Sequence, residues 1–392
     1  MSAVQIQISE SLEAMPATAR ELWRRLEPGL QFDQTLGWNE LLANHALEAG
    51  EGVQVLSAHR GAECIGVLPL KSGVREGMFG LKPLRALANY YCSLYSPILA
   101  SGDRAEVLRQ LLEAVPRLGP DVLDLNPLLD VADASAGEGA QADAAVNVDA
   151  RSVASALEQL GWRAERYFRF GNWYLEVGGR SFAEYFAGLP SQLRNTVTRK
   201  EKKLKQQAGL SIDIAQTPAE AQAALAGYQQ IYAASWKKPE PHPHFVPGLV
   251  RFLAERGWLR LGLVQLGAEP IAAQIWACKD GIVSIFKLAY DERFAQLSAG
   301  SVLTTQLMRH VIDVDRARIV DYLTGDDAYK RDWMSHRRER VGIRALSHKS
   351  WRARGESFAA AVASGLRPLR TALTAMRHRA QARRRPPTTP TA

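Results

Sequence analysis

Residues 257–278 read GWLRLGLVQLGAEPIAAQIWAC, two apolar runs separated by a short turn. The runs Leu259–Leu266 and Ile271–Cys278 are joined by the tripeptide Gly267-Ala268-Glu269. Apolar runs of this length on either side of a glycine-containing turn predict a β-hairpin. Beyond it, the pattern predicts a strand at Ile282–Ala289, a helix at Val302–Ile312 and a strand at Arg318–Leu323.

The first half of the chain carries a similar series. Gly61-Ala62-Glu63 joins two predicted strands there, and Asp124 follows the next helix at about the place of Asp321 in the second half. A repeated series of elements predicts an internal duplication, and the alternation of helices and strands predicts an α/β (α+β) fold with mixed sheets. The elements predicted here are helices at Thr18–Leu26, Asn39–Ala49 and Ala105–Val115, and strands at Val53–Ala58, Ile65–Leu70 and Asp121–Leu125.

With 392 residues, 46% of them apolar, the chain is long enough for two or three globular domains. No apolar run approaches the roughly 18 residues that a membrane-spanning helix needs, and no signal-peptide pattern is present, so a cytoplasmic protein is expected. Cys64, Cys92 and Cys278 are widely spaced, which favours buried thiols over a disulfide framework or a metal site.

The formal net charge of +8 is unevenly distributed. From Arg331 to the end there are 15 Lys and Arg and 3 Asp and Glu, which gives +12, so the preceding part, with 34 basic and 38 acidic residues, carries −4. Such asymmetry predicts a basic tail, residues 351–392, that touches something anionic, either the inner face of a membrane or RNA. A solvated, disordered tail is the alternative.

The turn before the predicted helix at Val302 reads Gln296-Leu-Ser298-Ala299-Gly300-Ser301. Its small and polar residues leave the first N–H groups of the helix accessible, and such groups bind anions together with the helix dipole. The turn therefore predicts a diphosphate site. An ordinary helix cap formed by Ser298 or Ser301 remains the alternative.

A second candidate site lies between Asp321 and Trp333. At a predicted strand end, the carboxylates of Asp321 and Asp326, the phenol of Tyr329 and the amine of Lys330 fall within about ten residues. Such a cluster offers a general base, an acid and a cation within reach of one another. A turn formed by Gly325 and its Asp neighbours is the alternative.

The segment Ser191–Lys205 is a predicted basic helix in which Arg194 stands apart from the later cluster of cations. Arginine binds phosphate in a bidentate manner, so Arg194 is a candidate ligand for a phosphate-bearing substrate. A solvated helix face is the alternative reading of the same pattern. Trp236 precedes a proline-rich stretch at Lys237–His244 that excludes helix and central strand, and it is a candidate wall of a cleft.

Taken in order, these residues resemble the GNAT-like acyltransferases related to CelD and FemAB. The motifs that carry the resemblance span about Phe182–Ser347, and more faintly Phe32–Pro127. They are Ser191-Gln-Leu-Arg194-Asn, Trp236, Gly257-Trp-Leu-Arg-Leu, Gly-Ala-Glu-Pro270-Ile-Ala272-Ala, Ala289-Tyr290-Asp291, Ser298-Ala-Gly300, and Asp321-Tyr-Leu-Thr-Gly325 with Tyr329, Lys330 and Trp333.

The resemblance implies two tandem GNAT-like domains, a degenerate one at residues 1–150 and an acyltransferase domain at 151–350, followed by the tail. It also implies that the pantetheine of acyl-coenzyme A lies along a splayed strand at Ile271–Trp276, with the diphosphate at Gln296–Ser301. The Ala-, Gly- and Asp-rich segment Asp130–Asn147 predicts a loop between the halves. The first half has Asp103 before its helix, where an anion would have to bind, so a structural role is expected for it.

The activity expected from the resemblance is transfer of an acyl group to an amine of a cell-envelope or exopolysaccharide precursor. The reaction needs a base, oxyanion donors and an acid for the leaving thiolate. We expect these to be Asp321 or Asp326, strand N–H groups near Gln274, and Tyr329, with Lys330, Arg194 and Trp236 on the acceptor. The alternatives are an aminoacyl-tRNA-dependent transferase and a non-catalytic component of a polysaccharide machine.

Overall fold

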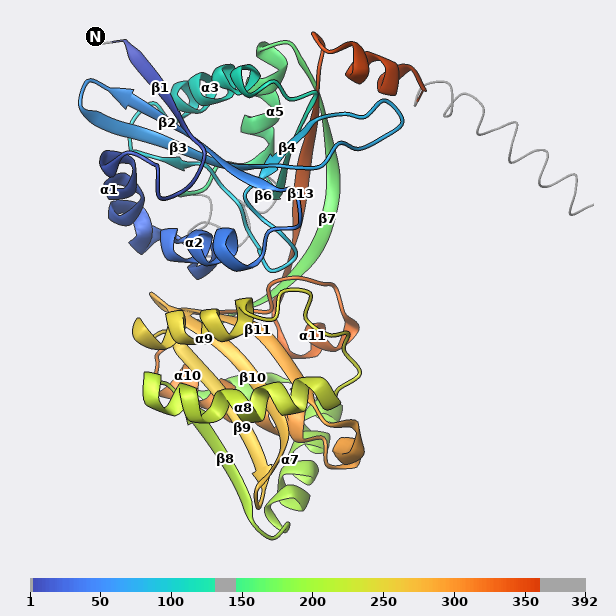
Figure 1. Cartoon of the computed structure of the whole chain (residues 1–392). Coiled ribbons are helices and arrows are strands. Elements are labelled where there is room, and N and C mark those ends of the chain that lie inside the picture. Colours follow the sequence, from blue (N-terminus) through green and yellow to red (C-terminus); the bar gives the residue numbers. More distant parts are fainter. Residues whose placement is uncertain (1–2, 131–145, 360–392) are drawn as a thin grey trace, which may run out of the picture.

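The structure, a computed structural model, describes residues 3–130 and 146–359 (Figure 1). One 13-stranded sheet runs through both halves of the chain in the order β1-β2-β3-β4-β6-β13-β7-β12-β11-β10-β9-β8, with β5 paired to β3. Helices pack on both faces of the sheet, which confirms the predicted fold class. The predicted loop at Asp130–Asn147 lies almost entirely outside the described residues.

The first half consists of two N-terminal helices, a meander of strands and two later helices on the opposite face (Figure 1). Val55 of one strand packs with the N-terminal helices, while the next residue, Leu56, packs with the later ones, as expected from the alternation of side chains in a strand. The elements are β1 Val4–Ser9, α1 Ala17–Leu26, α2 Leu36–His45, β2 Gly52–Arg60, β3 Glu63–Ser72, β4 Pro83–Ala86, β5 Ile98–Leu99, α3 Arg104–Ala114, β6 Val122–Leu129 and α5 Ala150–Gln159.

In the second half, α8 and α9 cover one face of the sheet and α10 the other (Figure 1). A capping box between Thr217 and Glu220, with Pro218 at the first position, starts α8. The elements are β7 Trp162–Glu176, α6 Phe182–Gly188, α7 Ser191–Lys205, β8 Leu210–Ala215, α8 Pro218–Ala234, α9 Phe245–Glu255, β9 Leu259–Leu266, β10 Glu269–Lys279, β11 Ile282–Tyr290, α10 Ala299–Asp313, β12 Ile319–Asp321, α11 Ala328–Trp333 and β13 His336–Ser347.

The order of strands confirms the predicted internal repeat. β1-β2-β3-β4-β6-β13 in the first half corresponds to β8-β9-β10-β11-β12-β7 in the second. The two Gly-Ala-Glu turns are equivalent, since Gly61 and Gly267 both adopt a φ of +61° that glycine tolerates. In each half one parallel pair ends on an aspartate, Asp124 opposite Arg85 and Asp321 opposite Ser284.

The long strands β7 and β13 join the two halves. β13 pairs with β6 along one edge and with β7 along the other, so a strand from the end of the chain completes the sheet of the first half. The sheet is therefore continuous across the predicted boundary at residue 150, and the limits of the two domains stay predictions. In the predicted tail, residues 351–359 are helical, and residues 360–392 lie outside the described part.

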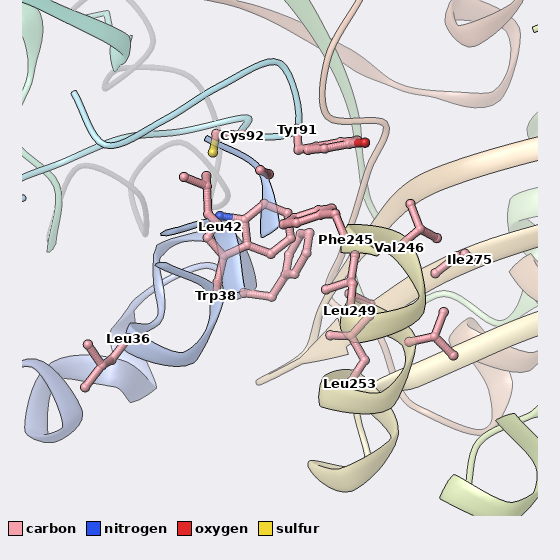
Figure 2. Close-up of a cluster of buried hydrophobic side chains, with 14 of the residues drawn as sticks. Leu36, Trp38, Leu42, Tyr91, Cys92, Phe245, Val246, Leu249, Leu253 and Ile275 are labelled. Carbon is pink, nitrogen blue, oxygen red and sulfur yellow. The ribbon is translucent and has the colours of Figure 1, made fainter. Parts of the chain in front are cut away.

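A shared aromatic core fixes one half against the other (Figure 2). Trp38 of α2 contacts Phe245 of α9 edge to face, with ring centroids 5.3 Å apart. Tyr91 of the first half stacks on the same Phe245 ring at 4.3 Å. Aromatic pairs of this kind add roughly 0.5–1.5 kcal/mol each beyond the apolar area that they bury. The core thus holds the loop around Tyr91 close to the second half.

Candidate active site

The parted strand in the second half is β11. Its first residues, Ile282–Ser284, pair in parallel with Ile319–Asp321 of β12, and the remainder of β11 pairs only with β10. A β-bulge lies just beyond the parting, because Trp276 pairs with Ile285 and the preceding Ile275 pairs with Lys287, leaving Phe286 as the extra residue. A bulge bends its strand and sharpens the local twist, which carries β11 away from β12.

This finding corrects the prediction that Ile271–Trp276 is the splayed strand. Those residues belong to β10, which pairs with β9 on one side and with β11 on the other. An open strand edge requires that one neighbouring strand be absent, whereas β10 is paired on both sides. The sequence pattern marks both strands as apolar and buried but carries no information on which edge lacks a partner.

A cavity of about 370 Å³ opens at the parted strand. Half of the predicted site residues come together in its wall, namely Trp236, Gln274, Ser298, Gly300, Ser301 and Tyr329. Trp236 is half exposed and packs against Tyr290 at the end of β11, with ring centroids 4.6 Å apart. The full lining is Trp236, Gln274, Leu288, Ala289, Tyr290, Ala295, Ser298, Gly300, Ser301, Thr304, Tyr322, Tyr329 and Trp333.

The first turn of α10 borders this cavity. Ser298 at the N-cap has a φ of +52°, and its side chain does not cap the helix. Its carbonyl accepts from the N–H groups of Ser301 and Val302, so the N–H groups of Ala299 and Gly300 remain at the helix start. Gly300 lies beside Tyr290, since a Cβ added there would be 3.6 Å from the tyrosine ring. The predicted Ser298–Ser301 turn is thus an uncapped helix N-terminus on the cavity wall.

Gln274 braces this helix start against the sheet. Its amide nitrogen donates to the carbonyl of Gly300 at 2.9 Å and to the hydroxyl of Thr304 at 2.8 Å, and its oxygen accepts from the indole of Trp276 at 2.9 Å. The side chain is buried and its hydrogen-bonding groups are all engaged. Gln274 therefore fixes the start of α10 against the sheet, while the backbone around it is occupied by pairing with β9 and β11.

Two tyrosines form the opposite wall. Tyr329 of α11 and the buried Tyr322 meet edge to face, with ring centroids 5.8 Å apart. Burial raises the pKa of Tyr329 to about 12, and the nearby negative charge of Asp327 contributes to the shift. Burial also raises the pKa of Tyr322 well above its ordinary value. Both phenols are therefore protonated at neutral pH, and Tyr329, which is half exposed, can donate a proton.

Neither predicted carboxylate base is free to act. Asp321 and Arg338 form a buried ion pair at 2.5 Å, and Asp321 also accepts from Asn172 and from the N–H of Leu323. Asp326 binds Arg337 at 2.7 Å, and this hydrogen bond lowers the pKa of Asp326 below its ordinary value. Neither residue lines the cavity. Both predicted bases are thus paired with arginines of β13 outside the cavity, which makes them less suited to accept a proton there.

The other predicted residues lie around the cavity rather than in it. Lys330 is buried and donates to the carbonyls of Thr324 and Gly325, which holds the turn of the Asp321–Trp333 segment together. The carbonyl of Gln296 accepts from Lys200 of α7 at 2.6 Å. Ala299 is buried in the first turn of α10. Arg194 lines a separate hollow between α6, α7 and α10, so it does not meet the other predicted residues.

A cluster of ionisable side chains beside the cavity was missed in the sequence. Glu240 binds Lys287 of β11 at 2.5 Å and accepts from Tyr90 and Tyr91 of the first half. Burial alone would raise the pKa of Glu240, but the hydrogen bonds, that of Lys287 first, lower it below its ordinary value. Lys237, next to the cavity residue Trp236, extends toward this cluster. In the sequence, Lys237 and Glu240 lie in the proline-rich stretch Lys237–His244, and charged residues in such a stretch do not by themselves indicate a site.

Lys237 is the unusual member of the cluster. Its Nζ lies 5.7 Å from the ring centre of Trp236 and 5.8 Å from that of Tyr232. Burial lowers the pKa of Lys237 to about 8, and the charges of Lys287 and Lys330 lower it further, while Glu240 and Asp327 act in the opposite direction. A substantial fraction of this amine is therefore neutral near pH 8, which suits a proton acceptor.

Within residues 3–130 and 146–359, the side chains form no group of three or more His, Cys, Asp and Glu that could hold a metal ion. None of the helices in that part of the chain is long and apolar enough to cross a bilayer.

Comparison with known proteins identifies the region that holds this cavity. Residues 191–331 match the family model described as an acetyltransferase (GNAT) domain. The matched range contains β11, the start of α10 and both wall tyrosines, so the predicted resemblance to GNAT-like acyltransferases is confirmed for this part of the chain. No curated protein matches the sequence.

Solved structures extend the likeness to nearly the whole fold. FemX superposes with a TM-score of 0.57 at 11% identity, over 88% of this chain and 98% of that chain. A conserved protein of unknown function from Bacteroides thetaiotaomicron VPI-5482 superposes with a TM-score of 0.51 at 9% identity, over 88% of this chain and 100% of that chain. These likenesses show the fold. The enzyme class rests on the domain match alone, which identifies residues 191–331 as an acetyltransferase domain of the GNAT type.

Proposed function

We propose that the chain transfers an acyl group from acyl-coenzyme A to an amine of a cell-envelope or exopolysaccharide precursor, like the CelD- and FemAB-related acyltransferases that its motifs resemble. The observation that carries the proposal is the meeting of a parted strand and an uncapped helix start in one cavity. We place the reaction in the cytoplasm, the compartment that supplies the thioester.

The donor fits the two open backbone elements. The edge of β11 beyond Ser284, which β12 leaves uncovered, can pair with the amides of a pantetheine arm as a sheet edge pairs with a peptide. The N–H groups at the start of α10 then bind the diphosphate, since an anion at a helix N-terminus gains from both the N–H donors and the dipole. The same β11 edge, rather than the backbone near Gln274, supplies oxyanion donors.

The chemistry follows from the side chains on either side of this path. The acceptor nitrogen attacks the thioester carbonyl carbon, a C–N bond forms, and the C–S bond breaks as the tetrahedral intermediate collapses. Lys237 in its neutral form accepts the proton that the acceptor ammonium must lose. Tyr329, protonated at neutral pH, returns a proton to the leaving thiolate.

The acceptor approaches from the side of Trp236 and the Glu240 cluster, between the two halves. Trp236 offers a half-exposed aromatic face, and Lys237 lies next to it. Lys330 acts through the turn that it holds and thereby fixes Tyr329. Arg194 is assigned no part in this path, because it lines a different hollow.

Transfer from an aminoacyl-tRNA is the second candidate, and the exposed cations of α7 favour it. Lys202, Lys203 and Lys205 are exposed there, and Lys200 reaches the turn before α10. Phosphate contacts from such side chains give a binding constant that falls steeply with salt.

Isothermal titration with acetyl-coenzyme A and, separately, with tRNA decides between the candidates. We expect heat from the thioester and none from tRNA at physiological salt. Salt-sensitive binding of tRNA without heat from the thioester transfers the assignment to the second candidate. Absence of both leaves a non-catalytic component, and the proposed function is then wrong.

A further inference from the structure

Four large apolar side chains are exposed on two neighbouring segments at one end of the molecule. Val74 and Met78 lie in the connection between β3 and β4, and their exposed fractions are 63% and 82%. Trp351 and Phe358 lie on the helix 351–359 that follows β13, with exposed fractions of 62% and 72%. Large apolar side chains are usually buried in a folded domain, and an exposed group of them often marks a binding surface. The group formed by Trp351, Phe358, Met78 and Val74 therefore requires an explanation.

The two segments pack directly on each other. Gly355 of the helix approaches Phe79 so closely that an added Cβ would lie 2.9 Å from the ring. Gly77 of the connection likewise lies beside Glu356 of the helix, since an added Cβ would be 3.0 Å from its carboxylate. On another side of the helix, Ala353 is buried against Leu81 and Val122. The exposed side chains thus form one surface, the 74–78/351–358 surface.

Positive charge surrounds this surface. Arg75, Lys349 and Arg354 are exposed next to the apolar side chains, and the guanidinium of Arg352 lies 4.9 Å from the ring centre of Trp351. Three acidic groups lie nearby in the described part of the chain. Asp121 is mostly buried and accepts from the hydroxyl of Ser350, and Glu76 is paired with Arg85 and Arg344. Glu356 of the helix lies beside Gly77, and one of its carboxylate oxygens has no hydrogen-bond partner among the described residues, so cations outnumber free acids around the apolar side chains. Exposed apolar side chains surrounded by cations suit the interfacial region of an anionic bilayer, where apolar groups enter the acyl-chain boundary and cations contact the headgroups.

The sequence that follows reinforces the same charge. Residues 360–392 contain arginines at 367, 370, 377, 379, 383, 384 and 385, and they contain no Asp or Glu. Stable attachment of a protein to a bilayer surface generally needs two signals, for example an inserted apolar group and a polybasic segment. This chain places the two signals next to each other, since the helix with Trp351 and Phe358 leads directly into the arginine-rich segment.

We propose that the 74–78/351–358 surface docks the enzyme on an anionic lipid bilayer. Trp351, Phe358, Met78 and Val74 enter the interface between headgroups and acyl chains, and the surrounding cations contact lipid phosphates. A second copy of the chain is a poorer occupant, because two such basic surfaces repel each other. The surface belongs to the first half, at the end away from the cavity, so docking leaves the second half facing the aqueous phase (Figure 1).

Vesicle sedimentation tests this proposal. The full chain is mixed with vesicles of phosphatidylcholine alone, or of phosphatidylcholine with phosphatidylglycerol, at low and high salt. We expect binding to the anionic vesicles, weakening with salt. The triple variant Met78→Ser, Trp351→Ser, Phe358→Ser should bind at least about tenfold more weakly, since burial of even one such side chain contributes about that factor.

The matched control is the double variant Phe168→Ser, Val314→Ser, which removes two exposed apolar side chains elsewhere on the surface. It should bind as the unmodified chain does, and all variants should unfold at the same temperature, because the changed side chains are exposed. The proposal is overturned if the triple variant binds anionic vesicles as tightly as the control. It is also overturned if the chain ignores vesicles, or if it forms a dimer in solution that only the triple variant dissociates.

Acyl transfer to a small amine in solution provides an independent readout. The triple variant should retain it, because none of its positions lies near the cavity. Loss of vesicle binding with full transfer activity therefore concerns the docking surface alone, whereas absence of thioester binding concerns the proposed function alone.

Discussion

The two halves of the molecule repeat one topology and differ at the strand that would receive a donor. In the second half, β11 runs without interruption from Ile282 to Tyr290 beside β10. In the first half the same path along β3 is divided, because β4 pairs with Leu70–Ser72 and β5 pairs with Gly66–Val67. Residues 87–97 between them leave the sheet. The first half therefore lacks a continuous edge to which a pantetheine arm can pair.

Residues 87–97 instead form contacts with the second half. They carry Tyr90 and Tyr91 to the second half, where both hydroxyls donate to Glu240 and Tyr91 stacks on Phe245. Since Glu240 also binds Lys287 of β11, the first half completes the polar cluster next to the cavity of the second. The two halves thus share a strand order, and the segment that divides the strand in the first half completes the surroundings of the cavity in the second.

The two halves also differ at the N-termini of the equivalent helices α3 and α10. In the first half, the carboxylate of Asp103 accepts from the N–H of Glu106 and caps α3. In the second, Ser298 leaves α10 without a side-chain cap. A carboxylate of the protein thus occupies in α3 the position that a phosphate would take in α10. In the described part of the chain, only the second half therefore has, in one cavity, both a helix start without a side-chain cap and a strand edge without a partner, the two features on which the proposed donor site rests.

The largest expected effect concerns the ion pairs between the equivalent aspartates and β13. Arg338 and Asp321 are 3% and 2% exposed, whereas Arg344 and Asp124 are 37% and 14% exposed and 3.6 Å apart. We expect Arg338→Leu to lower the free energy of unfolding by about 3–5 kcal/mol, because it leaves a buried carboxylate without its cation. Arg344→Leu should lower it by less than about 1 kcal/mol. Urea unfolding of both variants measures the difference, and equal losses would contradict the asymmetry.

Next in size is the effect of Lys237 on turnover. The base must be neutral, so kcat/KM should rise about tenfold per pH unit below the pKa of about 8 and level off above it. Lys237→Ala should lower kcat/KM about 100-fold at pH 8 and abolish this inflection. Lys287→Met should move the inflection to higher pH, because one of the charges that lower the pKa of Lys237 is removed.

The neighbouring Lys238 is exposed and supplies the control, since Lys238→Ala should keep both the rate and the inflection. An unchanged pH profile in Lys237→Ala would falsify the assignment of the base while leaving the donor site intact.

A smaller effect is expected when α10 is given the acid that α3 has. Ser298→Asp places a carboxylate at the helix start, and its repulsion of even one of the two diphosphate charges, at roughly 8 Å and an effective dielectric of about 20, amounts to about 2 kcal/mol. The affinity for coenzyme A should fall about 30-fold in isothermal titration. Ser298→Asn is the matched control, because asparagine also tolerates the φ of +52° but carries no charge. Equal affinities of the two variants would show that the diphosphate binds elsewhere.

The reverse change in the first half should have the smallest effect. Asp103→Ala removes the cap of α3 and should lower the free energy of unfolding by about 1 kcal/mol. It should create no second binding site for coenzyme A, because residues 87–97 still interrupt the strand edge. A stoichiometry of two in the same titration would mean that the helix cap alone had silenced the first half.

Local patterns predicted most of the fold. The strands at Leu259–Leu266 and Ile282–Ala289 and the helix at Ala105–Val115 lie within a residue or two of their observed limits. Alternation, turn residues and helical periodicity act over a few neighbours, so such elements can be predicted without tertiary information. The strands β7 and β13 were not singled out, since their many charged residues obscure the pattern of a central strand.

The candidate site was predicted in part for the same reason. Ser298, Gly300 and Tyr329 line the cavity, because a helix start and an aromatic near a strand end are local features. The ion pairs of Asp321 with Arg338 and of Asp326 with Arg337 cannot be predicted from local sequence, since the arginines reach them from β13. Lys237 was overlooked, because its neighbours Lys287 and Lys330 come from distant parts of the chain.

By itself the sequence determined the repeated series of elements, the two Gly-Ala-Glu turns and the helix start at Ser298, because short-range sterics and hydrogen bonding define them. The tertiary structure alone decided which strand has an open edge, which carboxylates are paired with arginines and which lysine is buried away from water. Each of these properties depends on what lies beside a residue in space, and pairing across the sheet brings together side chains that the chain order keeps far apart.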